Sequence, residues 1–176
     1  IAVSAVLVRK DLAMVSSEPG RPRLGFSIVR LIADIEKFLG YDSLSDAVIV
    51  GAGGLGRAFL GYEGFKSNGL NVVAAFDNNQ KLFGEIINGK PVLSMQAFEE
   101  FVKGHNVRIG IITVPKQAAQ EVLDAMERAG IQAVWNFAPA PLRIPKGMIV
   151  KTEDLAASLA ILAGKLGRVK TKENKE

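Results

Sequence analysis

The chain has 176 residues, of which 48% are hydrophobic and 23% charged, and its formal net charge is +4. This composition predicts a packed core, and the length suits one domain of roughly 100–150 residues with a smaller appendage. The sequence has no cysteine, which excludes disulfides, thiol catalysis and cysteine-based metal sites. We recognise neither a signal peptide nor an apolar run close to the ~20 residues of a membrane-spanning helix, and we expect a cytoplasmic protein with no membrane partner.

The first 40 residues contain one clear helical pattern. Leu31, Ile35, Phe38 and Leu39 are spaced so that they share the apolar face of a helix, and Gly40 is suited to end it. We therefore expect a small helical region to precede the main domain.

Residues 44–138 alternate between two hydrophobic periods. Short apolar runs of the kind found in buried parallel strands occur at residues 47–50, 71–76, 108–114 and 133–137, with a shorter one at 91–93. Between them, helical patterns occur at about residues 55–68, 94–103 and 116–129. Strands that alternate with helices at this spacing predict right-handed crossovers and a doubly wound, mostly parallel sheet.

The helix expected at residues 116–129 has an apolar stripe. Ala118, Val122, Ala125 and Ala129 fall on one face, and Gly130 follows as a suitable C′ residue. We interpret this stripe as the face that packs on the sheet.

The C-terminal region predicts a helix with no partner in that sheet. Leucines at 155, 159, 162 and 166 and Val169 are spaced 4, 3, 4 and 3 residues apart, which is a heptad-like seam. We expect residues 152–169 to form a dimerisation helix and residues 170–176 to form a disordered tail.

A glycine cluster lies between the first expected strand and the helix that follows it. Residues 51–56 satisfy the G-x-G-x-x-G pattern of dinucleotide-binding proteins. In that pattern the first glycine permits a tight turn, the second lets the backbone approach a pyrophosphate, and the third lets the helix pack closely. The start of the helix offers free N–H groups to the phosphates. The alternative is a strand-to-helix turn without a ligand. The candidate cofactor-binding residues here are Gly51, Ala52, Gly53, Gly54, Leu55 and Gly56.

An acidic residue ends the second expected strand. Asp77 follows Gly56 by 21 positions and is suited to accept hydrogen bonds from the adenosine ribose, with Asn78 beside it. A carboxylate at this position would repel the 2′-phosphate of NADP(H) and the 3′-phosphate of coenzyme A. The pattern therefore predicts NAD(H) as the cofactor and a Rossmann-like α/β domain in residues 41–151.

The sequence offers no evident acid–base partner for catalysis. His105 precedes the strand expected at residues 108–114, which places it at the opposite edge of the sheet from the ligand edge. A role for Lys116, which begins a helix, stays open. We therefore expect a sensor with no catalytic residues and no metal site. Two alternatives stay open: a CoA- or NAD-binding domain of a multi-subunit enzyme, and a regulatory domain of an ion transporter.

Several strings in chain order resemble the Rex family of redox-sensing transcriptional repressors. They cover nearly the whole chain, and RKDL and NFAP are more specific than the glycine pattern. The strings are VRKDL (8–12), GRPRLGF (20–26), VGAGGLGRAF (50–59), YEGF (62–65), AAFD (74–77), IGIITVP (109–115), AQEVLDAMERAGI (119–131), WNFAPAPL (135–142) and DLAASL (154–159).

The resemblance implies a homodimeric repressor that binds NADH and NAD⁺ and releases operator DNA when NADH rises. It implies a winged helix, a Rossmann domain and a C-terminal helix swapped between subunits. A complete winged helix needs more residues than precede the sheet here, so residues 1–40 would be a truncated winged-helix region with its linker helix.

The resemblance also implies roles for individual residues. Arginines and a lysine near the N-terminus would contact DNA, Tyr62 and Asp154 would couple the cofactor pocket to the DNA-binding region, and two strand ends would border the cofactor. The DNA-contacting residues are Arg9, Lys10, Arg21 and Arg23, and the cofactor-edge residues are Thr113, Val114, Pro115, Asn136, Phe137, Ala138 and Pro139.

Overall fold

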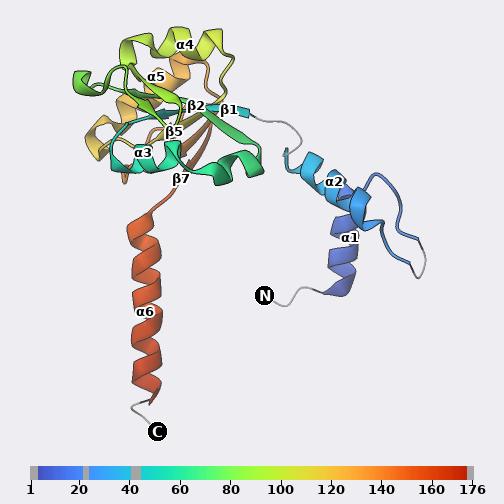
Figure 1. Ribbon diagram of the computed structural model, residues 1–176. Helices are drawn as coiled ribbons and strands as arrows, with labels where there is room; N and C mark the ends of the chain where they lie inside the picture. Colours follow the sequence, from blue (N-terminus) through green and yellow to red (C-terminus); the bar gives the residue numbers. More distant parts are fainter. Residues whose placement is uncertain (1–3, 22–23, 41–44, 174–176) are drawn as a thin grey trace. The chain divides into compact units, whose positions relative to one another are not determined.

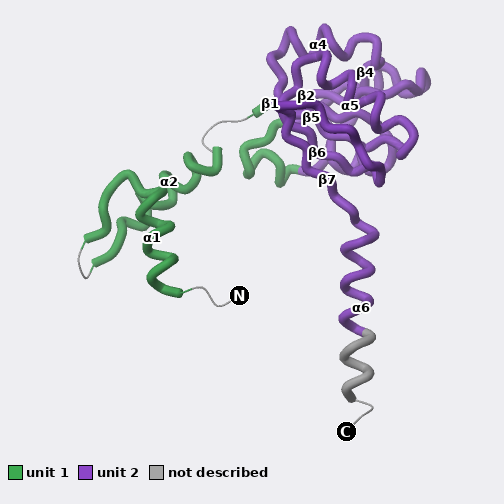
Figure 2. The backbone as a smooth tube through the Cα atoms, turned by 180° about the vertical axis from the view of Figure 1, so that it is seen from behind, with its two compact units in different colours: residues 1–45, 63–71 green, residues 46–62, 72–176 purple. Residues whose placement is uncertain are grey.

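The computed structural model describes residues 4–21, 24–40 and 45–173, with side chains as far as residue 166 (Figure 1). The chain divides into two compact units (Figure 2). The N-terminal unit comprises residues 1–45 and 63–71, and the sheet unit comprises residues 46–62 and 72–176.

Two helices form most of the N-terminal unit. They are α1 (Ala5–Val15) and α2 (Ile28–Phe38), and the short helix η1 (Glu63–Asn68) belongs to the same unit. The Ser4 hydroxyl caps α1 by accepting a hydrogen bond from the Leu7 N–H at 3.2 Å. Gly40 follows α2 in the left-handed region with φ +73°, so the helix predicted around residues 31–39 is confirmed together with its glycine stop.

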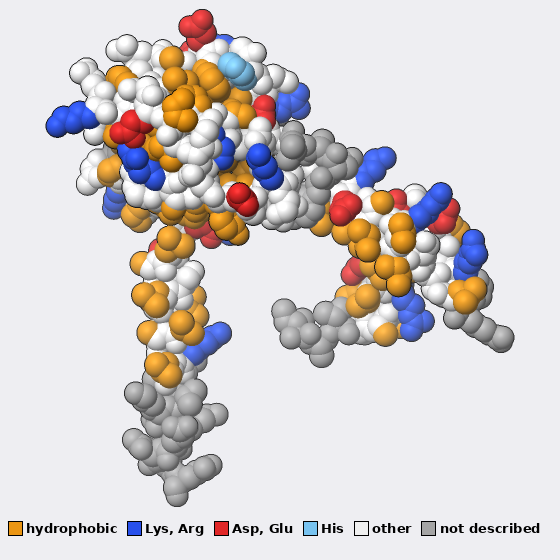
Figure 3. Space-filling model, viewed as in Figure 1, with side chains coloured by type: hydrophobic (Ala, Val, Ile, Leu, Met, Phe, Trp, Pro, Cys, Tyr) orange, Lys and Arg blue, Asp and Glu red, His pale blue; other side chains and the backbone are white. Residues whose placement is uncertain are grey.

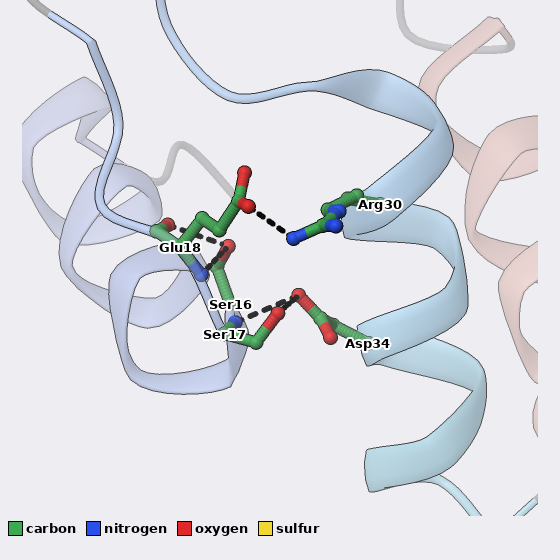
Figure 4. A network of polar contacts seen from close by, with 5 residues as sticks. All are labelled: Ser16, Ser17, Glu18, Arg30 and Asp34. Carbon is green, nitrogen blue, oxygen red and sulfur yellow. Dashed lines mark hydrogen bonds and ion pairs between the residues drawn. The ribbon is translucent and has the colours of Figure 1, made fainter.

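A polar network joins the C-terminal end of α1 to α2 (Figure 4). The Asp34 carboxylate accepts hydrogen bonds from the Ser17 N–H at 2.7 Å and from the Ser17 hydroxyl at 2.8 Å. Arg30 forms an ion pair with Glu18. The Ser17 backbone bond, followed by the Ser17 hydroxyl, lowers the pKa of Asp34 below its ordinary value, because both donors stabilise the ionised carboxylate.

A seven-stranded sheet forms the scaffold of the sheet unit, with strand order β3-β4-β2-β1-β5-β6-β7. The pairs β1–β5, β2–β4, β5–β6 and β6–β7 are parallel, whereas β3–β4 is antiparallel. The order from β4 to β7 is that of a dinucleotide-binding Rossmann sheet, which confirms the predicted fold class. The strands are β1 (Ser45–Val50), β2 (Leu70–Asp77), β3 (Ile86–Ile87), β4 (Lys90–Ser94), β5 (Ile109–Ile112), β6 (Ala133–Asn136) and β7 (Ile149–Thr152).

Helices cover both faces of this sheet, with α4 and α5 on one side and α3 on the other (Figure 1). Toward α4 and α5, the alternate side chains Val48, Val50 and Phe76 pack in one buried cluster. Phe76 meets the ring of Phe98 edge-on, with centroids 5.0 Å apart. The helices are α3 (Gly54–Leu60), α4 (Phe98–Gly104), α5 (Ala119–Ala129) and α6 (Leu155–Glu173), with short 3₁₀ turns η2 (Gln80–Leu82), η3 (Met95–Ala97) and η4 (Lys116–Ala118).

Two details of the predicted elements differ from the structure. The helix expected at residues 55–68 is divided into α3 and η1, with Gly61 capping α3. A Cβ on Gly61 would lie 2.6 Å from the Asn88 amide nitrogen, so a larger residue there would displace the Asn88 side chain. The strands β3 and β7 were not predicted, because β3 has only two residues and Ile86 and Ile149 are exposed, so neither strand forms a buried apolar run.

The C-terminal helix α6 begins at Leu155 and presents apolar side chains to solvent (Figure 3). Leu155, Leu159, Leu162 and Leu166 are between 60% and 66% exposed. The side chain of Val169, the last member of the predicted seam, lies outside the described residues. Within the described part of the chain, α6 and the other helices are too short or too polar to cross a bilayer.

Candidate functional site

The glycine turn between β1 and α3 is built so tightly that two of its positions exclude a side chain. Gly51 has φ +105°, and a Cβ there would lie 2.8 Å from the Thr113 carbonyl group. A Cβ on Gly56 would lie 1.9 Å from the Gly51 carbonyl oxygen. At Gly53, by contrast, a Cβ would enter open space. The turn therefore packs against β5 on one side and leaves Gly53 open on the other.

A cavity of about 430 Å³ opens beside Gly53, at the carboxyl ends of the parallel strands. It brings together predicted site residues from the ends of three strands. Seven predicted residues line it: Gly51, Gly53, Asp77, Asn78, Thr113, Val114 and Pro115.

The remaining lining of the cavity was not predicted. It comes from the end of β1, from η3 and from one face of η4 and α5, and comprises Val50, Met95, Ala118, Glu121, Val122, Ala125 and Arg128. The predicted core stripe on α5 is therefore partly a cavity wall, because Ala118 and Ala125 are only half-buried. Val122 and Ala129 are buried as predicted, and the rest of the buried face of α5 comprises Ala119, Leu123 and Met126. The small alanines at 118 and 125 are the signal that could have indicated a concave surface.

Asp77 ends β2 and lines the cavity while both of its carboxylate oxygens bind the backbone. Oδ2 accepts a hydrogen bond from the Ala52 N–H at 2.7 Å, and Oδ1 accepts one from the Asn79 N–H at 2.8 Å. Each carboxylate oxygen has two lone pairs, so both can accept a further bond from a ligand hydroxyl. Asp77 thus joins the glycine turn to the end of β2 and remains able to bind a ligand.

Thr113 fixes the opposite side of the turn. Its hydroxyl lies 2.7 Å from the Gly51 carbonyl oxygen and 3.1 Å from that of Val50. The Thr113 N–H also donates to the Val50 carbonyl at 2.9 Å. The end of β5 therefore holds the glycine turn in register with the sheet.

The predicted strand end at Asn136 has a different environment from the cavity. Asn136 is fully buried, its amide nitrogen donates to the Ala138 carbonyl and the Thr152 hydroxyl, and its oxygen accepts from the Ala138 N–H. Phe137 packs edge-on against Phe59, with centroids 4.8 Å apart. The predicted residues outside the cavity lining are Ala52, Gly54, Leu55 and Gly56 in the glycine motif, and Asn136, Phe137, Ala138 and Pro139 at the end of β6 and just after it.

The residues expected to couple the cofactor to DNA lie at the ends of helices. Asp154 caps α6, because its Oδ1 accepts a hydrogen bond from the Ala157 N–H at 2.8 Å. Tyr62 follows α3 and is 58% exposed.

The residues expected to contact DNA lie in the N-terminal unit. Arg9 and Lys10 are exposed on α1, and the backbone of Arg21 forms an antiparallel bridge with Gly25. Arg23 lies outside the described residues.

Comparison with known proteins identifies relatives along almost the whole chain. A family model described as the CoA binding domain matches residues 42–140. A redox-sensing transcriptional repressor Rex from Treponema denticola is 41% identical over 162 residues, which cover 92% of this chain and 77% of that protein. The Rex of Desulforamulus reducens is 42% identical with the same two coverages.

Solved structures of a Rex-family repressor called RSP are similar in fold. One is 33% identical, has a TM-score of 0.84 and matches 99% of this chain and 81% of that chain. A second, in complex with β-NAD⁺ and operator DNA, is 33% identical, has a TM-score of 0.88 and matches 98% of this chain and 79% of that one. A third, in complex with β-NADH, is 32% identical, has a TM-score of 0.83 and matches 99% of this chain and 81% of that one.

These relatives are named as transcriptional repressors, which confirms the prediction of a regulator in preference to an enzyme. The predicted resemblance is confirmed by identity near 40% over more than nine tenths of the chain. The chain belongs to the Rex family of redox-sensing transcriptional repressors.

Proposed function

We propose that this protein binds NADH and NAD⁺ in the cavity at the glycine turn and releases operator DNA when NADH rises. One observation carries the proposal: the same cavity is bordered by Gly53, where the backbone is open, and by the Asp77 carboxylate. The RSP complexes with β-NADH and with β-NAD⁺ and operator DNA support it.

In this site, three parts of a dinucleotide find suitable partners, namely the pyrophosphate, the adenosine ribose and the adenine ring. The backbone at Gly53 can approach the pyrophosphate, because no side chain occupies the space in front of it. Asp77 accepts hydrogen bonds from the adenosine ribose hydroxyls. Met95, Val122 and Ala125 provide an apolar wall on which a planar adenine ring can lie.

Coenzyme A is the second candidate ligand, because the CoA binding domain model matches residues 42–140. The Asp77 carboxylate argues against it, since the 3′-phosphate of coenzyme A would meet a negative charge close to the ribose. The same repulsion would act on the 2′-phosphate of NADPH.

Titration calorimetry of the protein with NADH, NADPH and coenzyme A tests the assignment. We expect NADH to bind at least about tenfold more tightly than NADPH or coenzyme A. Asp77→Asn removes the charge and retains one of the two acceptors for the backbone, so it should narrow the affinity gap between NADH and NADPH. Asp124→Asn removes a carboxylate from α5 outside the cavity and serves as the control. Equal affinities for NADH and NADPH in the unaltered protein would contradict the ribose assignment.

For DNA, we propose that Arg9, Lys10, Arg21 and Arg23 contact the operator as parts of a winged helix. Arginine and lysine side chains that reach phosphates fix the position of a protein on the duplex. The proposal therefore predicts that operator affinity falls with salt. A homodimer through α6 would present two such regions to adjacent half-sites. Because the proposed function is to bind operator DNA, we also propose that the protein lies in the cytoplasm.

The link between the two sites is proposed to run through Tyr62 and Asp154. A ligand shifts a two-state equilibrium only by its different affinity for the two states, so NADH must stabilise an arrangement that DNA does not. In the unaltered protein, NADH should lower operator affinity by about 5- to 150-fold, the usual range for allosteric coupling. Asp154→Ala or Tyr62→Phe should leave NADH binding intact and make this decrease smaller. If release by NADH is normal in both variants, Asp154 acts only as the cap of α6.

A further inference from the structure

All four backbone N–H and C=O groups of Gly51 and Ala52 form hydrogen bonds with other parts of the chain. The Gly51 N–H donates to the Phe76 carbonyl at 2.8 Å, and the Gly51 carbonyl oxygen accepts from the Thr113 hydroxyl. The Ala52 N–H donates to Asp77. The fourth group, the Ala52 carbonyl, accepts a hydrogen bond from the Nε of Arg57 at 3.1 Å. Arg57 is therefore the side chain that fixes the last peptide before Gly53.

Arg57 is itself fixed at its far end. Its Nη2 lies 2.6 Å from Oε2 of Glu85, in the loop before β3, and the two side chains are 41% and 39% exposed. A guanidinium is planar, so bonds from Nε and Nη2 set the direction of both donors together. The Glu85 backbone is held as well, by the Val92 N–H at 2.8 Å. Arg57 thus joins the glycine turn to the β3–β4 hairpin.

The Ala52 carbonyl and the Gly53 N–H belong to one planar peptide group. When Arg57 holds the carbonyl, the direction of the Gly53 N–H is set as well. Without that bond the peptide could rotate easily, because Gly53 accepts φ values that other residues avoid. Arg57 does not line the cavity beside Gly53, so it does not contact a ligand there, and its hydrogen bond to the Ala52 carbonyl links it to the cavity wall.

We propose that Arg57, held by Glu85, is a positioning residue for the dinucleotide: it orients the Ala52–Gly53 peptide so that the Gly53 N–H faces the pyrophosphate before the ligand arrives. The inference rests on the proposed function, since it requires a pyrophosphate at Gly53. Orienting the peptide in advance raises the affinity for the ligand, because binding then does not have to include the free-energy cost of ordering this peptide. The effect is specific to ligands that contain the pyrophosphate.

The test compares ligands with and without that group, using Arg57→Met and, as a matched control, Arg143→Met. Arg143 is exposed and lies outside the cavity lining. ADP-ribose contains the pyrophosphate and adenosine does not. We expect Arg57→Met to weaken ADP-ribose and NADH by about tenfold, the size expected for a lost hydrogen bond to a charged donor, and to leave adenosine unchanged. Arg143→Met should change neither. Adenosine and ADP-ribose affinities can be followed by NMR titration.

A second variant, which keeps Arg57 in the chain, distinguishes a positioning role of Arg57 from damage to the fold by Arg57→Met. Glu85→Gln retains a neutral acceptor for Arg57, so it should weaken ADP-ribose by only about two- to threefold, as expected for a half-exposed ion pair. Unchanged ADP-ribose affinity in Arg57→Met, or an equal loss for adenosine and ADP-ribose, overturns the inference. If the unaltered protein binds neither NADH nor ADP-ribose, the proposed function fails first and the inference falls with it.

Discussion

Helices α1 and α2, whose residues are all described, contain no buried side chain, whereas the single strand β1 contributes four residues that are at most 1% exposed. Ile28 and Val29 on α2 are 75% and 80% exposed. The sheet unit has its own hydrophobic core, and its glycine turn and cavity are supported by that core. Among the described residues, α1 and α2 have apolar side chains but no buried one. The buried core and the candidate cavity therefore both lie in the sheet unit, whereas α1, α2 and the described part of α6 present exposed apolar side chains.

The largest expected effect comes from a mutation that compares the two regions directly. Phe76→Ala removes a fully buried ring that packs on Phe98, and we expect it to cost about 3–5 kcal/mol of unfolding free energy. Ile28→Ala on α2 should cost less than about 0.5 kcal/mol, because the side chain is already in water. Trp135, the only tryptophan, lies on β6, so its fluorescence reports unfolding of the sheet unit in urea, and far-ultraviolet circular dichroism reports the loss of helix, which includes α2. Similar costs for the two variants would show that α2 is as well packed as the sheet.

The second prediction concerns α6, whose apolar side chains are exposed in a single chain. Burying a leucine side chain contributes about 1.5–3 kcal/mol, so a dimer seam through Leu159 and Leu162 should be sensitive to both. We expect Leu159→Ser with Leu162→Ser to weaken a homodimer by at least about 100-fold in sedimentation velocity.

Ile161 supplies the control for that experiment. It is 63% exposed on the same helix but lies outside the heptad seam, so Ile161→Ser should leave the dimer largely intact. A double variant that sediments like the unaltered protein would contradict assembly through this seam.

The comparison also explains which parts of the fold the sequence predicts well. Where a segment is buried on both faces, as at residues 47–50, a short continuous apolar run that a glycine turn follows favours a buried strand. Edge strands are different. In β7, Ile149 is 72% exposed, so this strand does not have the continuous apolar run that indicates a buried strand. The sheet was therefore predictable in its centre and not at its edges.

The candidate site was predictable to a similar extent. Glycine spacing and an acid at a fixed distance identify Gly51, Gly53 and Asp77, because backbone geometry imposes those residue types. Arg57 had no such signal, since its role depends on meeting the Ala52 carbonyl and Glu85 in space. Neither partner can be inferred from the position of Arg57 in a helical segment.

The smallest expected effect is a pH dependence confined to the N-terminal unit. Hydrogen bonds from the Ser17 backbone and hydroxyl lower the pKa of Asp34 below its ordinary value of 3.8. A carboxyl group whose pKa is lower in the folded state adds stability above its unfolded pKa. That contribution is lost as the pH falls through the folded pKa. The contact between α1 and α2 should therefore persist at neutral pH and weaken in acid below about pH 4. Asp34 is only half-buried, so the stability that is lost is small.

Amide chemical shifts and hydrogen exchange between pH 7 and pH 3 measure this effect at one bond. Protection of the Ser17 N–H, corrected for the intrinsic rate, should fall in acid, whereas amides of β1 such as that of Ile49 should keep theirs, because β1 is buried in the sheet. Asp34→Asn should abolish the pH dependence at Ser17, since an amide does not titrate in this range. Glu36→Gln removes a carboxylate from the same helix and should leave the Ser17 titration in place, because Ser17 bonds to Asp34. If Ser17 protection is independent of pH in the unaltered protein, or if Asp34→Asn still titrates at Ser17, then another group holds α1 to α2.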